Sequence, residues 1–434
     1  MPRLVIRIGA TCLVLLPALA RAQSPAPPPA SGGLTLDQAV QLTLSRNERA
    51  KISDLNVVVA EAAEQKAFTA FLPILTATGA DTQSAYPPAR TNNNIGTSAV
   101  TLNQPLLNAS AFPLYAQARK LADAQRSQNV DDRRLLGFTA ASAFFAVLNA
   151  QDIVQAAQHQ FDTAKANLDT AKARSESQLS SSNDLTKAQV DMANAAHEVE
   201  NDKGTLDNAL VQLAFTINAP APAPLAPPAP TLAAAQKAPG PADALLRFAL
   251  DHRPDVLVAK YQAAAAQDFA SEPMMRLIPT VGMQGQASGT TNSGATGHWN
   301  QETLTTTLTW TLFDAGVRYA DKHSRDAQAN IADLNLQYLA RNVDAQVRSA
   351  VALLVAAQAA FLVSADGVKF AIQNVDETAI LYRQGLATAL ELTTANDSRF
   401  TAEVNYASAE FTMAQAYLGL RQALGLDALG TELR

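Results

Sequence analysis

The five histidines, His159, His197, His252, His298 and His323, are the first candidates for chemistry, because imidazole binds metals and carries protons near neutral pH. They stand singly, whereas a zinc site brings its ligands together at short and regular spacings. The chain also contains no H-E-x-x-H, G-x-S-x-G or G-x-x-x-x-G-K-[ST] motif. We therefore predict a protein that is not an enzyme and that holds no metal or cofactor.

The N-terminus resembles a secretory signal peptide, which we place at residues 1–22. Arg3 and Arg7 precede a short apolar stretch that ends at an A-x-A cleavage site, Ala20 to Ala22. A transmembrane anchor is the alternative, but the stretch is shorter than the roughly 20 residues that span a bilayer. Cleavage would remove Cys12, the only cysteine, so we expect a mature chain without a thiol or a lipid-bearing cysteine.

The charge and hydropathy of the mature chain limit what it can bind and how it could span a membrane. Loss of the three arginines of the signal peptide changes the formal net charge from -6 to -9, which makes the protein a poor nucleic-acid binder. No later segment has 18 consecutive apolar residues, so no further transmembrane helix is expected. If the protein spans a membrane, it must do so with a closed β-barrel, which satisfies every backbone polar group in lipid.

The two halves of the chain repeat one another. Landmarks of the first half recur in the second at an offset of 206 residues, which becomes 207 after one single-residue insertion or deletion. Eight matches in the same order indicate a duplication. The matched landmarks are Leu44 and Leu250, Leu72-Pro73 and Ile278-Pro279, Leu102 and Leu308, Leu106-Leu107-Asn108 and Leu312-Phe313-Asp314, Leu179 and Leu386, Leu185 and Leu392, Ala188 and Ala395, and Asn218 and Gly425.

The duplication divides the mature chain into two similar units. We place the first repeat at 34–218, after a Pro-rich tether at 23–33, and the second at 242–426, before a tail at 427–434. The segment between them, 219–241, is packed with proline and alanine. That composition predicts an extended, semi-rigid linker rather than part of a core.

Each repeat contains two segments predicted to be strands, at 74–82 and 97–106 in the first and at 280–288 and 302–313 in the second. The last of them alternates leucine with threonine, which is typical of a strand with one apolar and one polar face. It fits either a half-buried strand of a soluble sheet or a barrel wall with lipid outside and water inside. The side chains that would face lipid are Leu304, Leu308, Trp310 and Leu312.

No proline occurs between Pro113 and Pro220 in the first repeat or after Pro279 in the second, and we predict helices at 109–177, 184–217, 317–383 and 390–424. Most of the third alone would extend about 95 Å at 1.5 Å per residue. Its apolar residues step by 4 and 3 in a heptad seam whose only polar member is Gln358. A dimeric coiled coil and a wall of paired helices around a channel both fit this pattern. The seam consists of Val347, Val351, Leu354, Gln358, Phe361, Ala365, Val368, Ile372, Val375, Ala379 and Tyr382.

Three motifs give the chain a resemblance to the TolC-like outer membrane efflux protein family, over nearly all of the mature sequence. Residues 34–39, Leu-Thr-Leu-Asp-Gln-Ala, are similar to the family's opening L-T-L-x-x-A. Residues 310–316, Trp-Thr-Leu-Phe-Asp-Ala-Gly, are similar to its W-x-L-F-D-x-G strand exit. Residues 382–385, Tyr-Arg-Gln-Gly, are similar to the Y-x-x-G that marks a helical tip.

The resemblance implies a mainly helical fold with a small membrane β part. Four strands per chain cannot close a barrel, but three chains supply twelve. The family would make this protein a homotrimer with a twelve-stranded barrel in the outer-membrane lipid of a Gram-negative cell and a coiled α-helical tunnel across the periplasm. It would be a passive channel, served by a periplasmic adaptor (a membrane fusion protein) and an inner-membrane RND or ABC pump in tripartite efflux or type I secretion.

The resemblance also assigns roles to residues at the predicted helix–helix turns. Tyr382 matches a gating tyrosine, Glu391 stands where the first Asp of the family's D-V-L-D-A stands, and Asp184 takes the equivalent place in the first repeat. Each has a simpler role: Asp184 as a helix cap, Glu391 as a solvated carboxylate and Tyr382 as the last seam residue. The residues predicted to contact the adaptor, because they stand at the exposed turns, are Gln178, Leu179, Ser180, Gly385, Leu386 and Ala387.

Two departures from the family pattern stand at the second tip. Ala387 replaces a residue that is often basic, and Thr394 replaces the second Asp of D-V-L-D-A. We therefore expect the closed state to lack one hydrogen-bond network found in relatives, and any acidic ring to be reduced. A periplasmic coiled-coil adaptor or scaffold is the alternative function, but it would not need two strand pairs. The sequence does not name the cargo, which could be drugs, metals, other small molecules or proteins.

Overall fold

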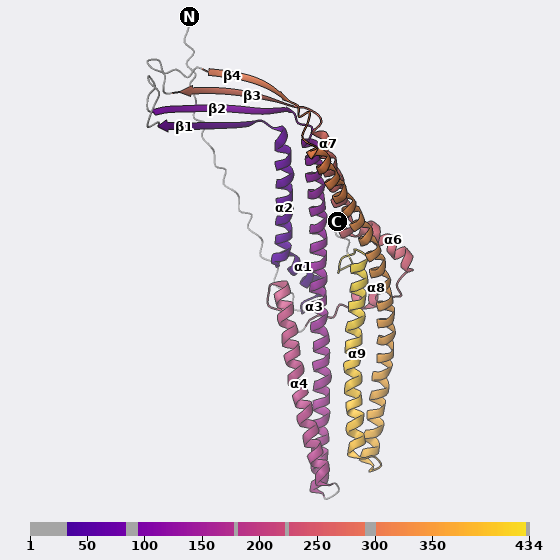
Figure 1. Ribbon diagram of the computed structural model, residues 1–434. Helices are drawn as coiled ribbons and strands as arrows, with labels where there is room; N and C mark the ends of the chain where they lie inside the picture. Colours follow the sequence, from indigo (N-terminus) through magenta and orange to yellow (C-terminus); the bar gives the residue numbers. More distant parts are fainter. Residues whose placement is uncertain (1–32, 84–93, 178–180, 222–224, 291–300, 431–434) are drawn as a thin grey trace.

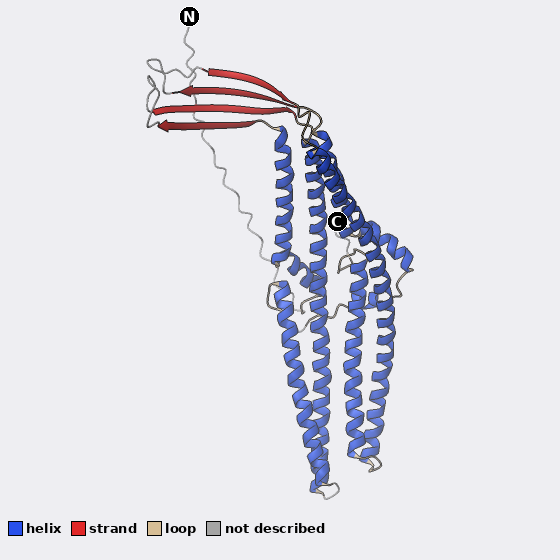
Figure 2. Cartoon of the chain, in the orientation of Figure 1, coloured by secondary structure: helices blue, strands red, loops and turns tan. Residues whose placement is uncertain are grey.

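The computed structural model describes residues 33–83, 94–177, 181–221, 225–290 and 301–430. A long body of helices carries a four-stranded sheet at one end (Figure 1; Figure 2). The predicted signal peptide, most of the tether, the two strand connectors and tip residues 178–180 lie outside the described residues.

The sheet is antiparallel, in the order β1 (Ile74–Gln83), β2 (Asn94–Leu107), β3 (Thr280–Thr290) and β4 (Gln301–Thr309). The central β2–β3 pair joins the two repeats. Its register shifts between Pro105 and Leu107, where proline lacks the N–H that a regular ladder needs. β1 and β4 are therefore the two edges of the sheet.

Two long helical hairpins extend away from the sheet. The first is α3 (Ala111–Glu176) with α4 (Ser182–Ile217), and the second is α8 (Val317–Arg383) with α9 (Ala389–Ala423). α3 packs against α4 and α9, and α9 packs against α8, so the lower body is a row in the order α4, α3, α9, α8 (Figure 1).

Shorter helices complete the body next to the sheet. α2 (Glu48–Phe68) and α7 (Pro254–Met275) pack against the upper parts of α3 and α8, in the order α2, α3, α7, α8. α2 stands above α4 in Figure 1, and a short 3₁₀ turn, η1 (Thr69–Phe71), leads from it to β1. α1 (Leu36–Arg46) and α6 (Ala242–His252) lie at mid-height and open the two repeats.

In each repeat, the helix that leads back from the tip, α4 or α9, ends at an equivalent contact. Asn47 Nδ2 donates to the Thr216 carbonyl at 2.9 Å, and Arg253 Nη1 donates to the Ala423 carbonyl at 3.1 Å. Both helices are then followed by a residue with positive φ, Asn218 at 48° and Gly425 at 81°. Such a residue closes a helix by satisfying its last carbonyls. The same offsets that relate the sequences thus relate these helix ends.

The hydrophobic core lies at mid-height, where the short helices meet the hairpins. Phe144, Leu213 and Ile217 are fully buried in one cluster, and Val343 and Val347 are fully buried in another. The predicted seam of α8 faces α9 here, since Leu354 is buried in the same cluster as Leu420 and Ala423 of α9. Burying large aliphatic and aromatic side chains contributes about 1.5–3 kcal/mol each, so this level holds the two repeats together.

In its described residues, the segment between the repeats differs from the extended, semi-rigid linker outside the core that its composition predicts. It contains a helix, α5 (Ala229–Ala235), and both Leu225 and Ala235 are buried, in two different hydrophobic clusters. Proline suits the first turn of a helix because its missing N–H has no partner there anyway. The alanines that follow then continue the helix, so a Pro- and Ala-rich stretch packs instead of extending.

The fourth strand is shorter than predicted. β4 ends at Thr309, which pairs with Thr280, and Thr280 follows Pro279, so the ladder has no further donor on that side. Trp310 and Leu312 therefore lie beyond the strand, not in it. The Trp310 indole N–H donates to the Leu277 carbonyl at 3.0 Å.

Among the described residues, α3 and α8 contain apolar windows long enough to cross a membrane by length and composition. The prediction of no further transmembrane helix rested on a stricter requirement, 18 consecutive apolar residues. At 66 and 67 residues, both helices extend far beyond a bilayer, and each pairs with an antiparallel neighbour. We therefore assign them to the hairpins.

Candidate functional site

The turn of the second hairpin is a tight helix end built on Gly385. The Leu386 N–H donates to the Leu381 carbonyl at 2.9 Å, five residues back, and Gly385 has φ of 77°. This is the Schellman arrangement, in which glycine takes the left-handed conformation without a Cβ penalty. It leaves Leu386 73% exposed at the extreme end of the hairpin, with Ala387 half-buried beside it.

Asp184 and Glu391 occupy the same structural position in the two hairpins. Ser181 caps α4, accepting from the Asp184 N–H, while the Asp184 carboxylate accepts from the Ser181 N–H at 3.3 Å. Thr388 caps α9 in the same way, and the Glu391 carboxylate accepts from its N–H at 2.7 Å. These reciprocal pairs are capping boxes, which satisfy two free N–H groups at a helix start.

The helix-cap role of Glu391 makes its carboxyl group more acidic. The hydrogen bond from the Thr388 backbone, followed by that from the Thr388 hydroxyl, lowers the pKa of Glu391 below its ordinary value. The carboxylate also lies in the first turn of α9, where the helix dipole favours negative charge. Glu391 is therefore ionised at neutral pH and exposed at the tip.

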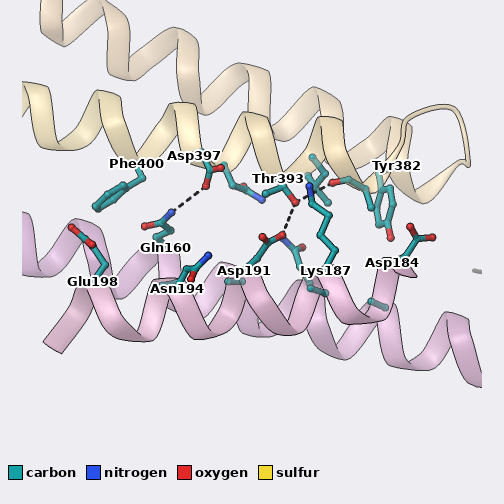
Figure 3. A pocket seen from close by; sticks show the side chains of 18 residues that line it. Gln160, Asp184, Lys187, Asp191, Asn194, Glu198, Tyr382, Thr393, Asp397 and Phe400 are labelled. Carbon is teal, nitrogen blue, oxygen red and sulfur yellow. Dashed lines mark hydrogen bonds between the residues drawn. The ribbon is translucent and has the colours of Figure 1, made fainter. Parts of the chain in front are cut away.

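A cavity of about 220 Å³ lies just above the tips, where the two hairpins meet (Figure 3). α4 contributes Lys187 and Asp191 to its wall, α9 contributes Thr393 and Asp397, and Tyr382 closes it toward the turn of α8. Asp184 also lines it, at the same tip end of the cavity as Tyr382 (Figure 3). The remaining lining residues are Gln160, Ala164, Asn167, Ala171, Ala188, Asn194, Ala195, Glu198, Ala389, Leu392, Asn396 and Phe400.

Polar contacts cross from one hairpin to the other around this cavity. The Thr393 hydroxyl donates to Asp191 at 3.0 Å, and Gln160 Nε2 donates to Asp397 at 3.2 Å (Figure 3). Partial burial raises the pKa of Asp397, and the charge of Asp191 raises it further, against smaller opposing effects of Gln160 and Lys187. The junction is thus held by hydrogen bonds to carboxylates, with like charges close together.

Tyr382 makes a third contact between the hairpins. The Arg174 guanidinium of α3 lies over the Tyr382 ring, 4.7 Å from its centroid, and Arg174 Nη2 donates to the Tyr382 carbonyl at 3.4 Å. A cation over an aromatic face is attracted by the ring quadrupole, by about 0.5–1 kcal/mol at exposed sites. Tyr382 therefore joins the tips of the two hairpins.

The sequence locates the turns but does not single out five members of this junction: Gln160, Arg174, Asp191, Thr393 and Asp397. Arg174 had one available signal, since basic residues favour the last turn of a helix. The others are polar residues on long polar helix faces, and nothing local separates them from solvated neighbours. Gln178, Leu179 and Ser180, predicted to contact a partner, lie outside the described residues.

The strand register arranges side chains across the sheet by type. Leu75 pairs with Leu102, Leu102 with Gly285, and Gly285 with Leu304, which makes an apolar row across four strands. Residues one position along form a polar row on the opposite face: Thr76, Thr101, Gln286 and Thr303. Leu304 and Leu308 are 73% and 62% exposed on the apolar face. Two opposite faces of different polarity are typical of a membrane barrel wall.

Apolar side chains also gather where the sheet meets the helices. Phe71 and Phe112 lie in contact, with ring centroids 5.0 Å apart and planes tilted by 44°, and Trp310 remains 57% exposed. Such aromatic groups favour the boundary between membrane and water. The exposed apolar residues of this belt are Phe68, Leu72, Leu106, Phe112, Leu277, Ile278, Trp310, Leu312, Phe313 and Tyr319. Among the described residues, no group of three or more His, Cys, Asp or Glu is arranged to hold a metal.

Comparison with known proteins gives a match to one protein family. Residues 245–426 match the family model of the outer membrane efflux protein. A comparison with curated proteins gave no match.

Solved structures match almost the whole chain. The channel CusC is 16% identical with a TM-score of 0.79, covering 90% of this chain and 92% of its own. The open-state MtrE outer membrane channel of Neisseria gonorrhoeae is 19% identical with a TM-score of 0.77, covering 92% and 90%. The CmeC outer membrane channel of Campylobacter jejuni is 14% identical with a TM-score of 0.76, covering 92% and 87%.

These likenesses confirm the predicted fold class, mainly helical with a small β part in each chain. They also agree with the prediction that the protein is not an enzyme, because the matched domain and the solved structures are those of channels. Residues 245–426 thus match the outer membrane efflux protein family, and the chain as a whole has the fold of the TolC-like outer-membrane channels.

Proposed function

We propose that three copies of this chain form a passive export channel, with a twelve-stranded barrel in the outer membrane and a helical tunnel in the periplasm. A periplasmic adaptor and an inner-membrane RND or ABC pump would dock on the tips and supply substrate and energy. The observation that carries the proposal is the sheet, which has an apolar face, a polar face and two unpaired edges.

The sheet edges support the trimer. β1 and β4 each present one row of unpaired N–H and C=O groups, and such groups cannot remain unsatisfied in lipid. β4 of one copy can pair with β1 of the next, since the two edges of the sheet are complementary. Three four-stranded sheets then close a twelve-stranded barrel, and closure removes every edge.

The helical edges support the same arrangement. At one side of the row, α2 exposes Ile52, Leu55 and Val59, and at the other side α8 exposes Ile331, Leu334 and Tyr338. Both sets step by 3 and 4, the spacing of a helix seam. Two different apolar edges on opposite sides of a chain make a head-to-tail interface, which closes into a ring when the rotation fits.

The tips support a gate. Three contacts join the hairpins there: Arg174 with Tyr382, Thr393 with Asp191, and Gln160 with Asp397. All three are polar and partly exposed, so breaking them costs little. Leu386, which is exposed at the turn of the second hairpin, is free to meet an adaptor.

The channel is tested with the purified full-length protein in planar lipid bilayers. We expect a trimer in detergent and discrete conductance steps after insertion from the periplasmic side. A stable trimer that never conducts, even after Arg174→Gln has weakened the tip contact, would contradict the proposal. A chain that fractionates as a water-soluble periplasmic protein would instead favour the adaptor alternative.

A further inference from the structure

Gln358 is the only polar residue in the seam of α8, and its position is unusual. Its seam neighbours Leu354 and Phe361 are 1% and 9% exposed, and Gln358 itself is half-buried between them. A polar side chain in an apolar seam reduces stability unless its hydrogen bonds are made. The residue therefore needs a partner, and α9 does not supply it.

The partner is the segment between the repeats. Gln358 Nε2 donates to the Ala235 carbonyl at 2.7 Å and to the Lys237 carbonyl at 2.9 Å. Ala235 is the last residue of α5, where the final carbonyls of a helix lack partners of their own. Ala235 is also fully buried, against Phe361 and Met413. The amide thus fixes the end of α5 to α8.

The other end of the same segment is fixed to the first repeat. Leu225 is 5% exposed in the cluster that contains Phe138 and Ile217, and the Ala226 N–H donates to the Leu34 carbonyl at 3.1 Å. We call residues 225–237 the crossing segment. It connects the core of the first repeat to α8 of the second hairpin at mid-height.

The kind of contact that joins the two hairpins changes below this level. Around and above the crossing segment, buried apolar clusters hold the hairpins together. Toward the tips, the cross-hairpin hydrogen bonds of the described side chains go to carboxylates and to one backbone carbonyl, around a cavity. A rigid upper part and a weakly joined lower part meet near Gln358.

We propose that Gln358 and the crossing segment form the fulcrum about which the second hairpin moves when the tips separate. The proposal rests on the channel function proposed above. From Gln358 to the end of α8 at Arg383 the helix extends about 37 Å, so a rotation of about 5° would move the tip by roughly 3 Å. Gln358 is a positioning residue: it fixes where the hairpin bends, without contacting the cargo.

The test compares Gln358→Leu with Gln373→Leu in the full-length trimer. Leucine at 358 keeps the seam apolar but removes both donors. Gln373 lies on the same helix and donates only to Glu377, so its substitution is the matched control. Because no cysteine is expected in the mature chain, a spin label on Gln384→Cys reports the distance between the three tips. Hydrogen exchange follows the crossing segment, and bilayer conductance follows the gate.

For Gln358→Leu we expect exchange at residues 235–237 to rise about tenfold, the effect of losing a net hydrogen bond. We also expect the tip-to-tip distance to broaden by roughly 3 Å or more, as the lever arm implies, and the resting conductance to rise at least about twofold. Gln373→Leu should match the wild type in all three measurements.

Two results would overturn the inference. Faster exchange at 235–237 with unchanged tip distances and conductance would show that the contact holds the segment but does not limit the hairpin. Unchanged exchange would show that Gln358 does not hold the segment at all. A wild-type trimer without conductance would be a failure of the channel proposal instead, and the spin-label distances would still test the fulcrum.

Discussion

At the scale of single residues, one of the three contacts that join the tips is the cation–π pair of Arg174 and Tyr382. Arg174 lies over the Tyr382 ring and also donates to the Tyr382 backbone carbonyl. Arg174→Gln removes the cation, so we expect the resting conductance to rise about two- to fivefold, the range set by about 0.5–1 kcal/mol. Tyr382→Phe keeps the ring and the carbonyl and should behave like the wild type in the same bilayer measurement. A rise in conductance for Tyr382→Phe with none for Arg174→Gln would mean that the tyrosine hydroxyl, not the cation, holds the gate.

The carboxylates of the junction make its stability depend on pH. The pKa of Asp397 in the folded protein is raised, first by burial and then by Asp191, so the native state binds a proton more readily than the unfolded chain. Stability therefore falls as pH rises from the ordinary aspartate pKa through the raised one. We expect Asp397→Asn to reduce this loss, measured as Tm between pH 4 and pH 7. An Asn variant with an unchanged slope would contradict it.

Glu391 should act in the opposite direction. Its pKa is lowered by the Thr388 backbone and hydroxyl, so the stability it contributes is present above the ordinary glutamate pKa and is lost as pH falls through the lowered one. Glu391→Gln keeps much of the capping geometry but loses the charge. We expect a slightly lower Tm than the wild type at pH 7, and a difference that shrinks as the pH falls below the ordinary glutamate pKa. A difference that persists in acid would indicate lost packing instead of lost charge.

At the scale of elements, the ends of the returning helices fix the repeats to the core. Gly425 has φ of 81°, and a Cβ there would stand 2.9 Å from the Arg253 Cα. Gly425→Ala should therefore destabilise the protein by about 2 kcal/mol or more, from left-handed strain and the clash with backbone. Gly419→Ala is the control: it lies inside α9 with nothing near its Cβ position, and it should be neutral or stabilise by up to about 1 kcal/mol. Comparing the Tm of each variant with that of the wild type tests this prediction.

At the scale of the whole molecule, the exposed seams predict assembly. Leu334 on α8 is 61% exposed in the single chain and lies at the edge of the row. A glutamate there would bury an unpaired charge between subunits, so we expect Leu334→Glu to convert most trimer to monomer in light-scattering measurements in detergent. Thr412→Glu is the control, because α9 has a helix on both sides within the chain. A Leu334→Glu protein that stays trimeric would exclude this edge from the interface.

The sequence by itself determined the elements of this protein. Proline-free stretches and a heptad seam located the long helices, and leucine–threonine alternation located the fourth strand, because these signals depend on neighbours along one element. Gly385 and the residues of the two capping boxes could likewise be placed from the sequence, since turns and helix starts are local. The duplication located the same elements twice.

Only the tertiary structure decided what lies between elements. Asp191 meets Thr393 and Gln160 meets Asp397 because two hairpins distant in sequence pack side by side, and no local pattern encodes that pairing. The segment between the repeats packs instead of extending for the same reason: its alanines find Phe361 and Met413 across the chain. The end of β4 also depends on tertiary structure, because a strand ends where its neighbour no longer provides hydrogen bonds.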